Sequence, residues 1–72
     1  MPEELDWTDF EEIGRLLYEQ MPDIDPLTVR FTDLKRYVFD LDGFVGERSA
    51  VNERKLEAIQ MAWHEVFEDE ET

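Results

Sequence analysis

The sequence predicts a small, mainly α-helical domain with three helices and one short extended connection. Three stretches repeat apolar residues at the spacing of an amphipathic helix, and proline or glycine residues separate them. The 72 residues suit one small domain, and 42% of them are hydrophobic, which is enough to build a core. We expect a single domain over residues 1–72, with an ordered core from about 7 to 67 and frayed ends.

The first helix is predicted to begin after Thr8. This residue suits the N-cap position, and Glu11 three residues later would complete a capping box. Gly14 costs this helix about 1 kcal/mol relative to alanine, so we expect another element to approach it closely. Pro22 ends the helix near Met21. The apolar stripe of this helix is Phe10, Ile13, Leu16, Leu17 and Met21.

The second helix follows a turn and the extended connection. Asp25 before Pro26 favours a turn, and Pro26 can open a short helical turn. The β-prone residues 29–31 supply the extended connection. Thr32 is the predicted cap of the second helix, with Asp33 near the positive end of its dipole. Its buried stripe is Leu34, Tyr37, Val38 and Leu41.

A loop and a third helix complete the chain. Asp42-Gly43 predicts a turn, and the loop that it opens extends to Val51. We expect Phe44 to reach the core from this loop, with Val45 as a second candidate. Asn52 is the predicted cap of the third helix. The apolar face of that helix is Leu56, Ile59, Trp63 and Val66 or Phe67.

The charge excludes several classes of function. Twenty acidic and seven basic residues give a net charge of −13, which argues against nucleic acids and anionic membrane surfaces as partners. The chain has no apolar run long enough to span a membrane and no signal peptide pattern at its start. It has no cysteine, which fits a reducing compartment, and we expect a monomer in the cytoplasm.

The sequence does not favour an enzyme. It contains one serine, Ser49, and one histidine, His64, and nothing in the pattern brings them together. The three glycines are scattered, so they form no phosphate-binding loop. We therefore expect no catalytic residues and no tightly bound cofactor.

Carboxylates offer two interpretations from spacing alone. Asp33 and Asp40 lie seven residues apart on one face of the second helix, and Asp42 and Glu47 follow in the loop. Oxygen ligands suit hard cations, and Fe²⁺ also accepts carboxylates, so Asp40, Asp42 and Glu47 are candidates for a weak, exchangeable metal site. The alternative is a solvated acidic face. A domain of this charge also suits docking on a basic patch of another protein.

The order of the helices resembles helix-turn-helix and winged-helix arrangements, which often read DNA. A recognition helix needs an excess of basic residues. Lys35 and Arg36 are balanced by nearby acids on the second helix, as Arg54 and Lys55 are on the third. A DNA-binding role is therefore the remote alternative.

Several motifs along the chain together match the pattern of one known family. The longest is the segment Asp25-Pro26-Leu27-Thr28-Val29-Arg30-Phe31-Thr32-Asp33-Leu34. The set also includes Trp7-Thr8-Asp9, Ile13-Gly14, Leu17-Tyr18, Asp40-Leu41, Phe44, Asn52-Glu53 and Leu56-Glu57-Ala58-Ile59 with Trp63. Together these motifs resemble IscX, the family of small acidic proteins of bacterial iron–sulfur cluster assembly.

This resemblance implies a winged-helix-like helical fold and a protein that is not an enzyme. It implies docking through an acidic surface on the cysteine desulfurase IscS, weak binding of Fe²⁺, and an indirect effect on the cluster scaffold. A dedicated iron donor is the alternative. The implied partner-binding residues are Asp33, Asp40, Asp42, Glu47, Glu53 and Glu57. Relatives often carry an aspartate-rich run after the motif's Phe. Here Phe44-Val45-Gly46-Glu47-Arg48 has fewer carboxylates, which should weaken a metal site.

Overall fold

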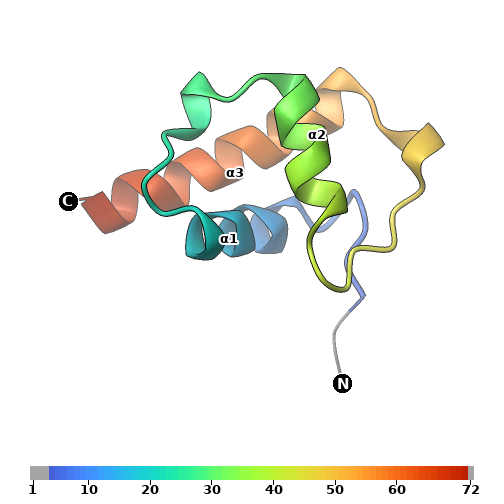
Figure 1. Cartoon of the computed structure of the whole chain (residues 1–72), viewed down its shortest axis with the longest axis horizontal. Coiled ribbons are helices and arrows are strands. Elements are labelled where there is room, and N and C mark those ends of the chain that lie inside the picture. Colours follow the sequence, from blue (N-terminus) through green and yellow to red (C-terminus); the bar gives the residue numbers. More distant parts are fainter. Residues whose placement is uncertain (1–3, 72) are drawn as a thin grey trace.

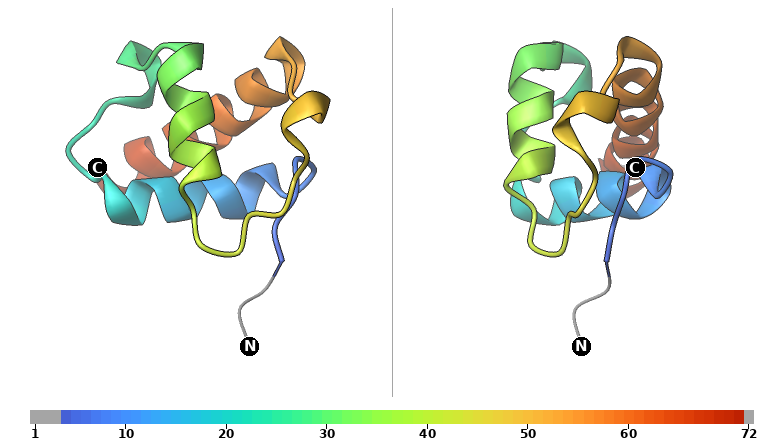
Figure 2. Two further views of the ribbon diagram at one scale, coloured as in Figure 1. Left: turned by 45° about the vertical axis from the view of Figure 1, so that its right-hand side comes forward. Right: turned by 90° about the vertical axis from the view of Figure 1, so that its right-hand side faces the viewer.

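The computed structural model describes residues 4–71, which form three α-helices and two short 3₁₀ turns. The bounds are α1 Phe10–Gln20, η1 Pro26–Thr28, α2 Phe31–Phe39, η2 Arg48–Ala50 and α3 Glu53–Glu71. The α1 helix packs against α3, and α2 lies across the direction of α1 and contacts both helices (Figures 1 and 2). The prediction of a mainly α, three-helix fold is therefore confirmed.

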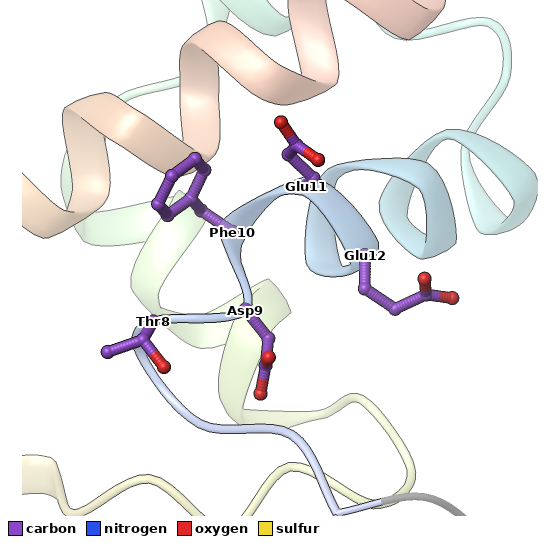
Figure 3. Close-up of a pocket in the computed structure, with 5 residues that line it drawn as sticks. All are labelled: Thr8, Asp9, Phe10, Glu11 and Glu12. Carbon is purple, nitrogen blue, oxygen red and sulfur yellow. The ribbon is translucent and has the colours of Figure 1, made fainter.

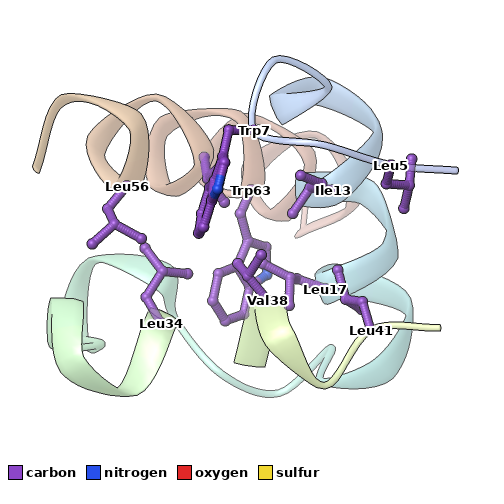
Figure 4. Close-up of a cluster of buried hydrophobic side chains, with 10 residues drawn as sticks. Leu5, Trp7, Ile13, Leu17, Leu34, Val38, Leu41, Leu56 and Trp63 are labelled. Atoms are coloured by element: carbon purple, nitrogen blue, oxygen red, sulfur yellow. The ribbon is translucent and has the colours of Figure 1, made fainter. Parts of the chain in front are cut away.

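The core lies where the inner faces of the helices meet the N-terminal segment (Figure 4). Trp63 of α3 is fully buried, and the ring of Tyr37 from α2 meets it edge to face at 6.5 Å between centroids. The structure confirms the central residues of each predicted stripe, but Phe10 at the start of the first stripe is 39% exposed. The buried cluster is Leu5, Trp7, Ile13, Leu17, Leu34, Val38, Leu41, Leu56, Ile59 and Trp63.

The start of α1 differs from the prediction that Thr8 caps it. The helix begins at Phe10, so Asp9 occupies the N-cap position, and its side chain makes no capping hydrogen bond. The hydroxyl of Thr8 instead donates to Oδ1 of Asp6 at 2.6 Å, and the backbone N–H of Asp6 donates to Oδ2 of Asp9 at 3.0 Å. These polar groups stabilise the turn before the helix, so the predicted capping box does not form.

Gly14 permits the close contact between α1 and α3, as predicted. A Cβ atom placed on Gly14 would lie 2.6 Å from the backbone nitrogen of Trp63 and 2.9 Å from the carbonyl carbon of Ala62. Neither backbone atom can move aside without displacing α3. The missing side chain therefore sets how closely the two helices approach.

The connection between α1 and α2 contains the predicted helical turn at Pro26. The side chain of Asp25 caps it by accepting a hydrogen bond from the backbone N–H of Leu27 at 3.0 Å. The amide of Gln60 on α3 donates to the carbonyl of Pro26 at 3.0 Å and fixes the turn against the third helix. After an extended backbone at Val29 and Arg30, α2 begins at Phe31. Thr32 therefore lies inside the helix, and its predicted capping role is wrong.

The N-terminal segment lies against the loop that follows α2. The backbone N–H of Leu5 donates to the carbonyl of Gly43 at 2.8 Å, and that of Val45 donates to the carbonyl of Leu5 at 2.7 Å. Gly43 has a φ of 87°, as the predicted turn requires. Leu5 is 4% exposed, so the packed core begins before residue 7. Val45, the second candidate for the core, is 56% exposed.

The likeness to a winged helix is not confirmed. Between residues 4 and 71 the extended backbone pairs only at an isolated parallel bridge between Leu5 and Phe44, and no strand forms that would make a wing. The loop instead acquires its shape from contacts with the N-terminal segment.

The third helix begins at its predicted cap and runs further than predicted. Oδ1 of Asn52 accepts a hydrogen bond from the backbone N–H of Lys55 at 2.8 Å, which confirms the capping role. The helix continues to Glu71, so residues 68–71 are helical rather than frayed, and Thr72 lies outside the described residues. Residues 1–3 of the predicted N-terminal tail also lie outside them.

Candidate functional site

Trp7 anchors the loop that carries several of the candidate carboxylates. Its indole Nε1–H donates to the carbonyl of Glu47 at 2.8 Å. The indole ring also meets the rings of Phe39 and Phe44 edge to face, with centroids 5.5 and 4.9 Å away. Only 5% of Trp7 is exposed, so the loop lies against a buried aromatic group. The position of the backbone at Glu47 therefore depends on a residue near the start of the chain.

Four of the six predicted partner-binding residues fall into two groups at opposite ends of α2, whereas Glu47 lies in the following loop and Glu57 on α3. Asp40 follows the last residue of the helix and Asp42 comes two residues later, both exposed. Asp33 lies in the first turn, about 10 Å away along the helix axis for a separation of seven residues. Glu53 belongs to the same end as Asp33, because a cleft between the starts of α2 and α3 is lined by Thr32 and Glu53.

Most of these carboxylates form no salt bridge with another described residue. Asp33 lies 3.6 Å from the guanidinium of Arg36, an exposed pair one turn apart. Within residues 4–71, no salt bridge involves the other five, which are Asp40, Asp42, Glu47, Glu53 and Glu57. Their negative charge is therefore presented to solvent and to any approaching partner.

Two basic side chains near the loop are directed toward the protein. The guanidinium of Arg48 lies over the ring of Phe39, 4.5 Å from its centroid. The ammonium of Lys55 donates to the carbonyl of Ala50 at 2.8 Å. Both contacts hold cations against the backbone or an aromatic face, so neither cation forms a salt bridge with the nearby acids in the described chain.

Metal ligands are not preassembled in the part of the chain that the structure describes. No group of three Asp, Glu, His or Cys side chains there is arranged to hold an ion, so Asp40, Asp42 and Glu47 do not converge. Any ion bound by these residues would draw most of its ligands from water.

Asp6 extends the acidic character toward the Trp7 anchor. It lines a shallow surface pocket with Trp7 and Glu47. The hydroxyl and the backbone N–H of Thr8 both donate to its carboxylate and lower the pKa of Asp6 below its ordinary value. The sequence interpretation missed this residue because it placed Asp6 in a frayed tail.

No hydrogen bond joins Ser49 and His64 in the described part of the chain. Ser49 lies exposed in η2, whereas Nε2 of His64 lies 2.7 Å from a carboxylate oxygen of Glu68 one turn later on α3.

Among residues 4–71, no helix is long and apolar enough to cross a membrane.

A further surface was missed by the sequence interpretation. Phe10 and Glu11 at the start of α1 line a groove with the middle of α3, where Met61 is 49% exposed. Phe10 was assigned to the core, and Met61 carried no signal because its partner across the groove is far away in the sequence.

Comparison with known proteins agrees with the resemblance to IscX. The family model described as iron–sulphur cluster assembly matches residues 5–68, which include all three helices up to the last turn of α3. An uncharacterized protein of Pseudomonas aeruginosa is 46% identical over 61 residues, which cover 85% of this chain and 92% of that protein. The chain therefore belongs to the iron–sulphur cluster assembly family, the family that its resemblance to IscX indicated.

Proposed function

We propose that this protein is a non-catalytic, acidic adaptor or regulator of iron–sulfur cluster assembly that docks on the cysteine desulfurase IscS. The observation that carries the proposal is the set of carboxylates along α2, the following loop and the start of α3, most of which are exposed and form no salt bridge in the described chain. Membership of the assembly family supports a role beside that machinery. We expect a cytoplasmic monomer that influences the cluster scaffold through the desulfurase.

Electrostatics would dominate the encounter. A net charge of −13 attracts a basic surface over long range and accelerates association. The attraction weakens once the Debye length falls to about 8 Å at physiological ionic strength. The proposal therefore predicts binding that is strong at low salt and weakens as salt increases.

The test is calorimetric titration of the full chain into the desulfurase at two salt concentrations, with matched charge reversals. Asp40→Lys/Asp42→Lys alters the proposed surface, and Glu19→Lys/Asp23→Lys makes the same change in net charge on exposed residues elsewhere. We expect the first variant to weaken binding about tenfold or more and the second about twofold. An equal loss in both would attribute binding to net charge alone, and no loss in either would exclude this surface.

Iron binding follows as a second part of the proposal. We expect Asp40, Asp42 and Glu47 to bind Fe²⁺ weakly and exchangeably, with water completing the coordination. Anaerobic titration of Fe²⁺ at physiological salt tests this expectation. Tight binding that survives salt and depends on these three residues would favour the alternative, a dedicated iron donor.

A further inference from the structure

A groove between the start of α1 and the middle of α3 exposes two large apolar side chains. Phe10 is 39% exposed and Met61 is 49% exposed, whereas the other described phenylalanine and methionine residues are partly buried. Figure 3 shows Phe10 and Glu11 directed toward α3, whereas Asp9 points away from it. The groove is lined by Phe10, Glu11, Ala58, Met61, Ala62 and Glu65.

The groove stays open because its lining on α3 includes small residues. Ala58 and Ala62 line the groove together with Phe10 and Met61, and each contributes only a methyl group. The close approach at Gly14, one turn further along α1, holds the two helices at a fixed separation. Exposed apolar groups that share one concave surface usually mark a place where another chain binds.

Acidic residues surround the apolar groups on both helices. Glu11 comes from α1 and Glu65 from α3, and both line the groove. Glu57 and Glu65 lie four residues before and after Met61, so each is one helical turn from it on the same face. A ligand that inserts an apolar group here therefore meets carboxylates on either side.

We propose that this α1–α3 groove is a docking surface for a cationic amphipathic helix of a protein partner. One large aliphatic or aromatic side chain of that helix would pack between Phe10 and Met61. Lysine or arginine residues one turn away would pair with Glu11 and Glu65. Methionine suits such a surface because its flexible side chain adapts to different partners.

A second copy of this chain is the less favourable occupant. Each copy carries a charge of −13, and a self-complementary contact would place the carboxylates that border one groove against those of the other. The groove also lies on different elements from the loop that holds Asp40, Asp42 and Glu47. The inference therefore does not depend on that loop. Glu57 borders the groove and is also one of the residues proposed to contact the desulfurase, so the two contacts would adjoin on α3.

The test is an NMR titration of the full chain with synthetic peptides. The probe is a helical peptide with leucine and lysine at amphipathic spacing, and its matched control replaces every leucine by serine and keeps the charge. We expect the leucine peptide to shift the amide signals of Phe10, Ala58 and Met61 most strongly. Met61→Ser should weaken its binding about tenfold, whereas Leu27→Ser, which changes an equally exposed residue elsewhere, should change it about twofold or less.

Two outcomes would overturn the proposal. Equal binding of the serine peptide, or equal affinities of the Met61→Ser and Leu27→Ser variants, would show that charge alone attracts the peptide. Self-association in sedimentation experiments that Met61→Ser abolishes would assign the groove to a second copy of the chain. Circular dichroism of both variants confirms that they remain folded, which is expected because both side chains are exposed.

Discussion

The contact between α1 and α3 and the loop after α2 are stabilised by different means. The two helices meet through fully buried side chains and the close approach at Gly14. The loop has little regular structure beyond η2, and it is held by Leu5 and by the hydrogen bond from Trp7 to Glu47, forty residues later. Repeating local patterns thus determine the first region, whereas a few contacts distant in sequence determine the second.

This difference bears on the two surfaces proposed above. The α1–α3 groove is formed by helices whose relative position is fixed by packing, so it should keep its shape in every folded variant. Asp40 is held at the end of α2, but Asp42 and Glu47 lie on the loop whose position depends on Leu5 and on the Trp7 anchor. A change at the anchor should therefore loosen the acidic surface while the helices remain packed.

The largest effect is expected at the helix contact. Gly14→Ala would place a Cβ 2.6 Å from the backbone nitrogen of Trp63, so α1 and α3 must separate. The gain in helix propensity of about 1 kcal/mol is smaller than the cost of this overlap, and we expect a net loss of about 2–3 kcal/mol. Urea denaturation measures it. The control Glu19→Ala, exposed on the same helix, should stay within about 0.5 kcal/mol. If Gly14→Ala leaves the free energy of unfolding unchanged, then α1 and α3 can move apart without destabilising the fold.

A smaller and more local effect is expected at the anchor. Trp7→Phe removes the donor to the Glu47 carbonyl and part of the ring that packs on Phe44, which should cost about 1–2 kcal/mol. Amide hydrogen exchange should accelerate more at Val45 than in α3, because the backbone N–H of Val45 belongs to the contact that the anchor supports. The matched change Trp63→Phe should accelerate amide exchange more in α3 than at Val45. Uniform acceleration by both variants would contradict two separately stabilised regions.

The sequence predicted the helices well because each carries a repeating apolar pattern. It also predicted the close approach at Gly14 and the turn at Pro26, since both follow from local backbone chemistry. It failed for Leu5, which has no pattern around it and is buried by a loop about forty residues away. The extent of α3 was underestimated because its acidic last turns have no apolar stripe of the predicted kind.

The candidate site was predicted less completely than the fold. Asp40 was predicted on the second helix but follows its last residue, and linear spacing did not separate Asp33 and Glu53 from Asp40 and Asp42 at the other end of α2. The groove between α1 and α3 could not be predicted, because Phe10 and Met61 become neighbours only after the helices pack. Whether the acidic residues bind a partner or iron stays a prediction.

The smallest effect compares two helix starts for which the sequence predicted the same role. Asn52 accepts a hydrogen bond from the N–H of Lys55, whereas Thr32 lies inside α2 after Arg30 at the N-cap position. We therefore expect Asn52→Ala to lower the free energy of unfolding by about 1 kcal/mol and Thr32→Ala to change it by about 0.5 kcal/mol or less. Thermal denaturation followed by circular dichroism measures both. Equal losses would mean that the Thr32 hydroxyl caps α2 in solution, and the chain would then enter both helices in the same way.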